Sequence, residues 1–518
     1  MHASHAPSGP SPFAPFLALA RSPRQGIALA CVLAGVLLAL YPPSSMPPQA
    51  ARPAGLAVGA IGLWVTAVIP EYLTALLFFL LAILLRAAPP ATVFSGFHSA
   101  TFWLVFGGLC MGAAMHHTGL GARIARGLLT RTGSGYAALV WGLVLAGVLL
   151  SFVMPSSMGR IALLVPLAVS LAEAAGYGTD TAQRTGIVLA ALFGALQPAF
   201  AILPANVPNM ILAGSAENLF GHTLTYGRYL LLHFPVLGLL KTVLIGMAVL
   251  WLYPPHASAP SSGRSPGRRM NHIDAGGTAS DSRPAGAGRS GPAASMTDGG
   301  PASSPVTPAT PATPAERRLM AVLTVAVGLW ATDFLHHVSP AWISLGAAIL
   351  CLWPPLGLTG KQAITRDMSM APLLFVAGIM GLGAMVATSG LGHLLVRAML
   401  DALPLAQGEP ARNFAVLTGY AMVTGLLTTL PGIPAVLTPL AGDLAAASGL
   451  GLETVLMTQI VAVSSMFLPY QSPPLVVAMQ LGSVPSGHMT RLCLLLAAVN
   501  VAILLPLQYL WWRWLGVI

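Results

Sequence analysis

Long stretches without a charged side chain recur along this 518-residue chain. Twenty-eight residues separate Arg131 from Arg160 and 32 separate Arg184 from Glu217, with no Asp, Glu, Lys or Arg between them. A helix needs about 20 apolar residues to cross the hydrocarbon of a bilayer, and its backbone must be hydrogen-bonded internally there. The pattern therefore predicts an all-α polytopic membrane protein with about 11 transmembrane helices. Clear spans are expected to begin near residues 26, 54, 72, 100, 135, 187, 229, 319, 341, 371, 413 and 491, and short or interrupted ones near 161, 394, 435, 455 and 474.

The composition excludes a soluble globular protein. Hydrophobic residues make up 55% of the chain and charged residues 7%, whereas a soluble domain carries about 25% charged residues. The net charge of +10 does not indicate a nucleic-acid partner, because no basic patch coincides with a soluble domain. We therefore expect the lipid bilayer, and no nucleic acid, as a partner. The four cysteines lie apart in apolar runs and have neither disulfide nor zinc spacing.

One internal segment differs from the rest of the chain. Residues 254–315 contain no Phe, Trp or Tyr and are rich in Pro, Gly, Ser and Ala. Such a segment buries too little apolar surface to fold, so we expect a disordered linker, and its excess of arginine favours the cytoplasmic side. The predicted organisation is a cytoplasmic N-terminal tail (1–25), a first transmembrane helix plus repeat 1 (26–253), the linker, and repeat 2 (316–518).

The two apolar halves repeat each other. Residues 106–129 match residues 377–400 at an offset of 271, and a Pro-interrupted segment at 203–208 has a counterpart at 468–473. Repeated glycines alone are explained by close helix packing. Paired proline breaks are more typical of secondary transporters, which bind substrate where interrupted helices from two repeats meet near the middle of the membrane.

On these motifs the chain resembles the divalent anion/sodium symporter family of citrate, dicarboxylate and sulfate transporters. The segments Phe94–Leu129 and Leu329–Pro354 carry the resemblance, which covers nearly all of the chain outside the tail and linker. It implies two inverted repeats with re-entrant hairpins and broken helices, a small anionic substrate, a homodimer in the cell inner membrane, and alternating access by an elevator motion. Na⁺ and H⁺ are the candidate coupling ions, and no other cofactor is expected.

Two other functions are compatible with the same pattern. One is an oxyanion or metalloid exporter of the same superfamily, and the other is an anion channel. An enzyme is not expected, because the long uncharged stretches hold neither a nucleophile with a base nor paired acids.

The resemblance also implies a binding site made of two hairpin tips and two helix breaks. The tips of the family have a Ser-Asn-Thr pattern, and they match residues 155–160, with Ser156 ten residues before Pro166, and residues 428–431, with Thr429 ten residues before Pro439. The substrate-binding candidates at the tips and breaks are Ser156, Ser157, Arg160, Asn206, Pro208, Asn209, Thr428, Thr429, Gln471, Ser472, Pro473 and Pro474.

Sodium would lie near Ser156, Ser157 and Thr429 according to the resemblance. The chain departs from the family there, since Ser157 and Leu430 replace the two asparagines, and Met158 and Pro431 take the third tip positions. Sodium is a hard cation that prefers oxygen ligands, so these departures remove side-chain ligands from both tips and leave backbone carbonyls as the alternative ligands.

Arg160 is the most informative single residue. An arginine within a span is costly and usually faces a cavity or a partner, and its planar fork suits a carboxylate or another oxyanion. We expect it to contact the anion directly or to supply fixed positive charge where sodium is missing; the alternative is an interfacial arginine that snorkels to the headgroups.

For the other polar side chains, a purely structural role is an alternative to a functional one. Asn206, Asn209 and Gln471 either present their amides to an anion or cap backbone groups freed by the prolines. Asp333 and the histidine pairs at 116–117 and 336–337 lie near predicted span ends. We expect Asp333 to be interfacial rather than a proton carrier, and the histidines to be solvated or packed rather than metal ligands or a proton relay.

Overall fold

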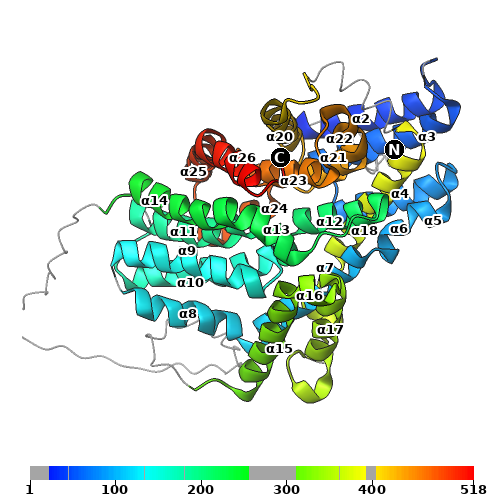
Figure 1. Ribbon diagram of the computed structural model, residues 1–518. Helices are drawn as coiled ribbons and strands as arrows, with labels where there is room; N and C mark the ends of the chain where they lie inside the picture. Colours follow the sequence, from blue (N-terminus) through cyan, green and yellow to red (C-terminus); the bar gives the residue numbers. More distant parts are fainter. Residues whose placement is uncertain are drawn as a thin grey trace, which may run out of the picture. The chain divides into compact units, whose positions relative to one another are not determined.

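The computed structural model describes residues 23–44, 46–133, 135–179, 181–255, 311–360, 362–391 and 404–518. Within these residues every regular element is a helix, and all the helices pack together into one compact unit (Figure 1). Most of the predicted tail and linker, and the interrupted span expected near residue 394, lie outside the described residues. The predicted domain boundaries therefore stay predictions.

The first half contains α2 (Pro23–Leu40), α3 (Pro48–Thr66), α4 (Glu71–Leu84), α5 (Pro90–Val93), α6 (Ser95–His98), α7 (Ala100–Thr118), α8 (Leu120–Thr132), α9 (Tyr136–Val153), α10 (Ser157–Ala174), α11 (Ala182–Leu196), α12 (Val207–Phe220), α13 (Tyr226–His233) and α14 (Lys241–Leu252). Two short 3₁₀ turns, η1 (Pro198–Ala201) and η2 (Leu203–Ala205), separate α11 from α12. A π-helical segment, η3 (Phe234–Leu240), joins α13 to α14.

The second half contains α15 (Pro314–Ala331), α16 (Asp333–His336), α17 (Pro340–Leu352), α18 (Ala371–Thr388), α20 (Pro410–Leu427), α21 (Gly432–Leu437), α22 (Ala441–Ser448), α23 (Leu452–Val463), α24 (Pro473–Gly482), α25 (Ser486–Val499) and α26 (Leu505–Trp514). The short η6 (Thr438–Leu440) lies between α21 and α22, and η7 (Pro469–Gln471) lies between α23 and α24. A second π-helical segment, η8 (Asn500–Leu504), joins α25 to α26.

The described residues contain six helical spans that are long and apolar enough to cross a membrane. These are Tyr136–Val153, Ser157–Ala174, Ala182–Ala201, Tyr226–Leu252, Ala371–Thr388 and Ser486–Trp514. Helix α20 and the segment α21–α22 are together long and apolar enough to cross a membrane, but the chain bends by 118° at the break between them. An all-α membrane protein with broken helices is thereby confirmed, while the count of about 11 spans stays a prediction.

The order of elements recurs in the two halves. Helices α7 and α18 begin 271 residues apart, and α12 and α24 begin 266 residues apart. The π-helical segments η3 and η8 also begin 266 residues apart, each within the last long helix of its half. The helices that precede the two breaks, α11 and α23, are therefore equivalent, as are the helices that follow them.

Helix α11 is buried along almost its whole length, which the sequence permits because its neighbours offer glycines. A Cβ atom added to Gly147 of α9 would lie 2.4 Å from the Ala195 nitrogen of α11, so the two backbones touch. Small residues at such crossings let helices pack closely in a membrane. Helices α8, α9, α10, α11 and α14 accordingly lie as a stack at the left of Figure 1.

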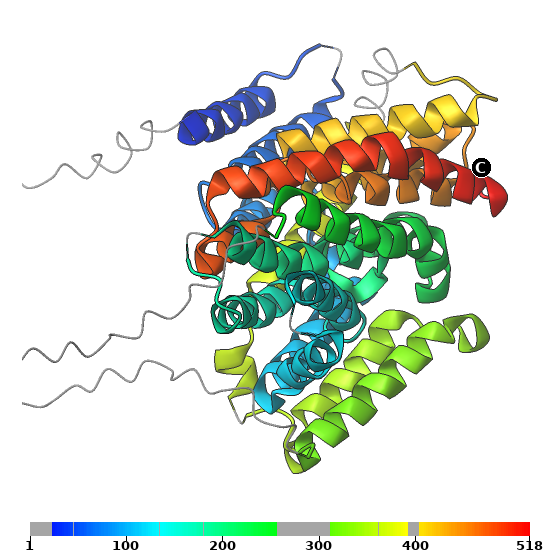
Figure 2. The same ribbon diagram turned by 90° about the vertical axis from the view of Figure 1, so that its left-hand side faces the viewer.

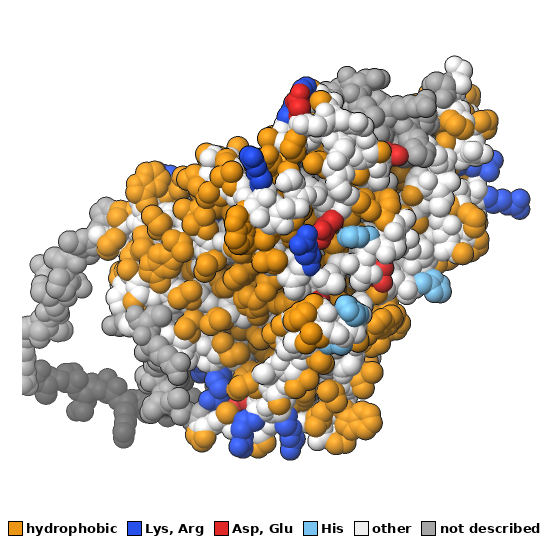
Figure 3. Space-filling model, in the orientation of Figure 1, with side chains coloured by type: hydrophobic (Ala, Val, Ile, Leu, Met, Phe, Trp, Pro, Cys, Tyr) orange, Lys and Arg blue, Asp and Glu red, His pale blue; other side chains and the backbone are white. Residues whose placement is uncertain are grey.

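The long C-terminal helix α25–α26 lies beside α14 and α20 (Figure 2). Phe414 of α20 contacts Trp512 of α26 edge to face, with ring centroids 5.4 Å apart. Hydrophobic side chains cover much of the face seen in Figure 3, and basic side chains gather at the lower end of α15. Arg123 of α8 forms an ion pair with Glu316 of α15 at this end, with an N–O distance of 2.8 Å.

Candidate functional site

The first hairpin tip lies between α9 and α10. The chain leaves α9 at Val153 and re-enters a helix at Ser157, and the Ser156 hydroxyl accepts a hydrogen bond of 3.1 Å from the Gly159 N–H. Ser156 is therefore the N-cap that starts α10. Met158 points outward and is 39% exposed, so it offers nothing to the interior of the tip.

Arg160 is completely buried behind this tip. Its Nε donates to the Ala195 carbonyl at the end of α11 (2.9 Å), and its Nη1 donates to the carbonyls of Met154 and Ala205 (3.0 Å to Ala205). Its Nη2 donates to the Ser157 hydroxyl at 3.1 Å. The alternative of an interfacial arginine that snorkels to the headgroups is wrong, because the guanidinium joins the ends of three interrupted chain segments.

Two asparagines hold the first helix break in place. The Asn206 Oδ1 accepts from the Asn209 N–H at 3.2 Å and caps α12, and its Nδ2 donates to the Ala199 carbonyl at 2.9 Å. The Asn209 Nδ2 donates to carbonyls in and beside η1, including Ile202 at 2.9 Å. Both side chains therefore satisfy backbone groups freed by the break, and within the described residues the buried Asn209 Oδ1 has no hydrogen-bond partner. Pro208 is buried in the first turn of α12.

The second hairpin tip is the bend between α20 and α21. The Thr428 hydroxyl donates to the Thr424 carbonyl at 2.8 Å, as threonines at helix ends commonly do. Thr429 is also buried, and no hydrogen bond of its hydroxyl is found within the described part of the chain. One hydroxyl of this tip is therefore committed to the backbone, and the other is available to a ligand.

Gln471 connects the second break to the second tip. Its Oε1 accepts from the N–H groups of Phe467 (2.7 Å) and Leu468 (2.8 Å), and its Nε2 donates to the Gly425 carbonyl of α20 at 2.6 Å. Ser472 is a buried residue whose hydroxyl has no hydrogen-bond partner among the described residues, and α24 begins directly after it with Pro473 and Pro474. Because proline has no N–H, the Ser472 hydroxyl is the polar donor nearest to the start of this helix.

The halves interlock around the four segments. Helix α12, which follows the first break, packs against α18 and α21 of the second half. Helix α24, which follows the second break, packs against α10 and α11 of the first half. Each tip is hydrogen-bonded to the break of its own half, so within each half the structure brings together the tip and break residues that the sequence indicated. Their role in binding stays a prediction.

Several buried polar residues near the second break escaped the sequence analysis. Lys241 is 1% exposed, and its Nζ donates to the Ser464 carbonyl and, at 2.8 Å, to the Ser464 hydroxyl. Asn500, at the start of η8, donates to the Ser465 hydroxyl. The sequence does mark Lys241 as unusual, because it is one of only two lysines in the chain and interrupts an apolar run.

Asp333 corrects another expectation. We expected it at the interface, but it is 1% exposed, and its Oδ2 accepts a hydrogen bond from the Tyr226 N–H at the start of α13. The histidine pairs do not form a metal cluster: no group of three or more His, Cys, Asp or Glu side chains is found in the described residues.

The hydroxyl oxygens that the resemblance assigns to sodium at the first tip are occupied by donors of the protein. The Ser156 hydroxyl accepts from the Gly159 N–H, and the Ser157 hydroxyl accepts from the Arg160 guanidinium. A sodium ion beside Ser157 would lie against the Arg160 guanidinium. The residues present therefore do not fit sodium at the first tip.

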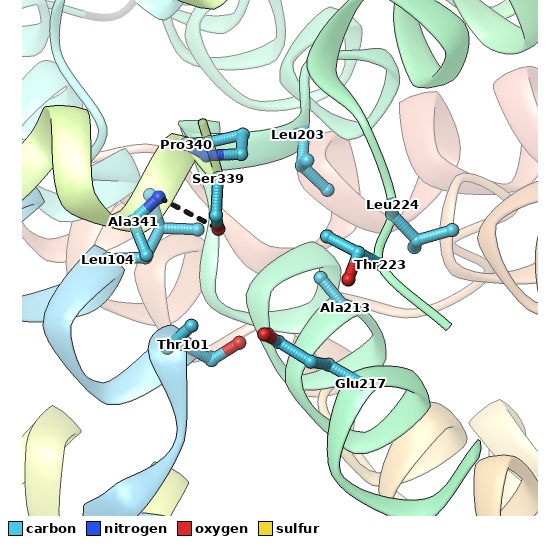
Figure 4. A pocket seen from close by; sticks show the side chains of 11 residues that line it. Thr101, Leu104, Leu203, Ala213, Glu217, Thr223, Leu224, Ser339, Pro340 and Ala341 are labelled. Atoms are coloured by element: carbon cyan, nitrogen blue, oxygen red, sulfur yellow. Dashed lines mark hydrogen bonds between the residues drawn. The ribbon is translucent and has the colours of Figure 1, made fainter. Parts of the chain in front are cut away.

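A separate small pocket lies between α7, α12 and α17 (Figure 4). Glu217 and Thr101 point their oxygens toward one another across it, and Ser339 caps the neighbouring helix by accepting from the Ala341 N–H at 3.4 Å. Leu203, at the start of the first break segment, lines this pocket, but none of the twelve substrate-binding candidates does. It is thus distinct from the core where the tips and breaks meet.

Comparisons with known proteins agree with this architecture. A membrane protein from Cupriavidus necator is 23% identical over 509 residues, which cover 93% of this chain and 91% of that protein. The sodium-dependent dicarboxylate transporter SdcS from Staphylococcus aureus is 24% identical over 237 residues, so the match covers 44% of this chain and 44% of SdcS.

A solved structure has the same fold. The crystal structure of the YdaH transporter from Alcanivorax borkumensis, described as having an unusual topology, aligns with a TM-score of 0.52 at 18% identity. The alignment covers 95% of this chain and 98% of that one. A family model described as the sodium:sulfate symporter transmembrane region matches residues 24–518. Because this match includes nearly the whole chain, the protein belongs to the sodium:sulfate symporter transmembrane family.

Proposed function

We propose that this protein is a secondary transporter of small divalent anions across the cytoplasmic membrane, with dicarboxylates and sulfate as the first substrates to test. Family membership and the sodium-dependent dicarboxylate transporter among its relatives support this class of substrate. The observation that carries the proposal is the pairing of each hairpin tip with a helix break: Arg160 bonds to Ala205 in the first half, and Leu430 bonds to Gln471 in the second.

The proposed site lies between these paired segments. The positive ends of the α12 and α24 dipoles favour an anion there. Pro208, Pro473 and Pro474 remove N–H groups from these helix starts, so the Thr429 and Ser472 hydroxyls supply hydrogen bonds in their place. Arg160 acts from behind the first tip, where its charge attracts the anion while its N–H groups hold the backbone that shapes the site.

Tips and breaks that are bonded to one another move together. We propose that they form a transport unit that carries the anion by an elevator motion, within a homodimer whose linker (254–315) is cytoplasmic. An exposed cluster of basic side chains at 126, 317 and 318 near the end of the linker favours that orientation.

Uptake into vesicles reconstituted with the purified full chain tests the function. Radiolabelled sulfate, succinate, citrate and arsenate are offered under a sodium gradient, under a proton gradient, or with unlabelled anion inside. We expect saturable uptake of a divalent anion, accelerated by the same anion inside. Transport of arsenate alone would favour the oxyanion exporter, non-saturable flux without counterflow would favour a channel, and no flux of any anion would contradict the proposal.

A further inference from the structure

Two fully buried cations, both contributed by the first half of the chain, bind carbonyl oxygens at the C-terminal ends of equivalent helices in the two halves. Arg160 donates to the Ala195 carbonyl in the last turn of α11, and Lys241 donates to the Ser464 carbonyl at the end of α23. Helices α11 and α23 are the members of the repeat that precede the two breaks. Each break thus begins at carbonyl oxygens that are bound by a positive side chain.

The Lys241 position is built from segments far apart in the sequence. The lysine follows the π-helical segment η3, and such segments often occur at functional sites because they redirect side chains. The equivalent segment η8 begins with Asn500, which bonds to Ser465, the neighbour of Ser464. Both π-helical segments therefore direct a polar side chain at the same helix end.

The oxygen-lined helix ends around Arg160 and Lys241 resemble the sites where transporters bind metal cations. A buried ammonium is costly unless its charge is compensated, and within the described residues neither Lys241 nor Arg160 forms an ion pair with a carboxylate. The two positive charges are compensated instead by carbonyl and hydroxyl oxygens, including those at the negative ends of the interrupted helices. In secondary transporters such helix ends and unwound carbonyls are where Na⁺ is coordinated.

The use of lysine at position 241 and of arginine at position 160 agrees with a role as bound cations. The chain contains 24 basic residues, of which only Lys241 and Lys361 are lysines. Lysine presents a compact point charge with three donors, whereas arginine presents a broad planar fork. A compact charge matches the two oxygens of Ser464, and the fork of Arg160 matches the spread carbonyls of Met154, Ala195 and Ala205.

We propose that Arg160 and Lys241 are resident cations that replace inorganic cations at the two helix breaks, so that anion binding in this protein needs no sodium at either position. The anion part of this inference rests on the proposed function, and the cation part does not. Transport is then driven by a proton gradient or by exchange of anions rather than by sodium bound at these helix ends.

The test uses thermal unfolding of the purified full chain in sodium chloride and in choline chloride of equal ionic strength. The wild-type melting temperature is expected to be the same in both salts. Lys241→Ala is expected to melt lower in choline and to recover as sodium or methylammonium is added, because the vacated oxygens of Ser464 accept a small cation. The double variant Lys241→Ala/Ser464→Ala, which lacks one of those oxygens, should lose much of this recovery.

Two further variants guard against misfolding and non-specific charge effects. Lys241→Gln keeps a donor for the Ser464 carbonyl but removes the charge, and should weaken anion binding by roughly tenfold with little loss of stability. Arg228→Gln removes an exposed cation from the same long helix and should change neither the sodium response nor anion affinity.

The outcomes separate the two proposals. Specific stabilisation of the wild type by sodium, or a Lys241→Ala protein indifferent to small cations, would overturn the resident-cation inference, as would unchanged anion affinity in Lys241→Gln. If no anion is transported by the wild type, the proposed function fails, while the comparison of salts still decides the role of Lys241.

Discussion

The backbone N–H of Leu430 donates a hydrogen bond of 2.8 Å to the carbonyl oxygen of Gln471. This bond joins the second hairpin tip to the second helix break, and the Gln471 amide reinforces it by donating to Gly425 of α20. In the first half Arg160 makes the corresponding connection to Ala205. The two halves thus use different residues to fix a tip against a break.

Gln471→Ala should destabilise the protein markedly. The substitution leaves the N–H groups of Phe467 and Leu468 and the Gly425 carbonyl without their partner, and each unpaired buried group costs about 1–3 kcal/mol. Thermal unfolding of the purified protein measures the loss. Gln407→Ala is the matched control, because Gln407 is exposed and makes one long bond of 3.4 Å to Ala446. Equal melting temperatures for the two variants would show that Gln471 does not hold the break.

Thr429→Val and Ser472→Ala should weaken anion binding while leaving stability nearly unchanged. Both residues are buried, and their hydroxyls have no protein partner among the described residues. The loss of one hydrogen bond to a charged ligand corresponds to about 1.5–3 kcal/mol, or at least a tenfold rise in Kd. Titration calorimetry measures it. Thr424→Val is the control on α20, since its hydroxyl already donates to the Tyr420 carbonyl at 3.0 Å; a loss of affinity as large in the control would remove these hydroxyls from the site.

Arg160→Gln should abolish anion uptake and lower the melting temperature together. A glutamine cannot reach the three carbonyls that the guanidinium joins, and it carries no charge. Arg160→Lys restores the charge but not the fork, so it should recover part of the affinity and little of the stability. Arg412→Gln, which breaks an exposed ion pair with Glu409, serves as the control. Wild-type uptake in Arg160→Gln would show that the site does not depend on this side chain.

The ion pair between α8 and α15 predicts a pH dependence of stability. The hydrogen bond from Arg123 holds the pKa of Glu316 below its ordinary value of 4.5, and the Thr313 backbone N–H at 2.7 Å adds to this effect. A depressed pKa means that the folded state binds the proton less tightly, so the stabilisation is present above the ordinary pKa and is lost as the pH falls through the lowered value.

Glu316→Gln should therefore melt below the wild type at pH 7, with the difference shrinking as the pH is lowered below 4.5. Melting curves of both proteins across this range test the prediction. A difference that stays constant with pH would mean that the carboxylate charge contributes nothing and that Glu316 acts only through its packing.

Local patterns were sufficient to predict the elements but not all of their partners. The prolines at 208 and 473 marked both helix breaks, and the uncharged runs marked the spans, because these effects act within a few residues. Arg160 was recognised as unusual for the same reason. Its partners Ala195 and Ala205 lie 35 and 45 residues away, however, and no local pattern distinguishes backbone carbonyls from an anion as the acceptor.

The residues that were missed or misplaced owe their positions to long-range packing. Lys241 meets Ser464 across 223 residues, and Asp333 meets Tyr226 across 107. In each case the sequence shows a polar residue near or within an apolar run, but only the assembled halves show what compensates its burial. Lys241 meets the second half at the end of α23, the helix equivalent to α11.

The central claim is that the paired tips and breaks enclose the anion. Anomalous diffraction from crystals grown with a heavy analogue of the transported anion, selenate for sulfate or bromosuccinate for a dicarboxylate, locates that anion directly. The account predicts an anomalous peak within hydrogen-bond distance of the Thr429 and Ser472 hydroxyls. A peak in the pocket between α7, α12 and α17, with none between the tips and the breaks, would contradict it.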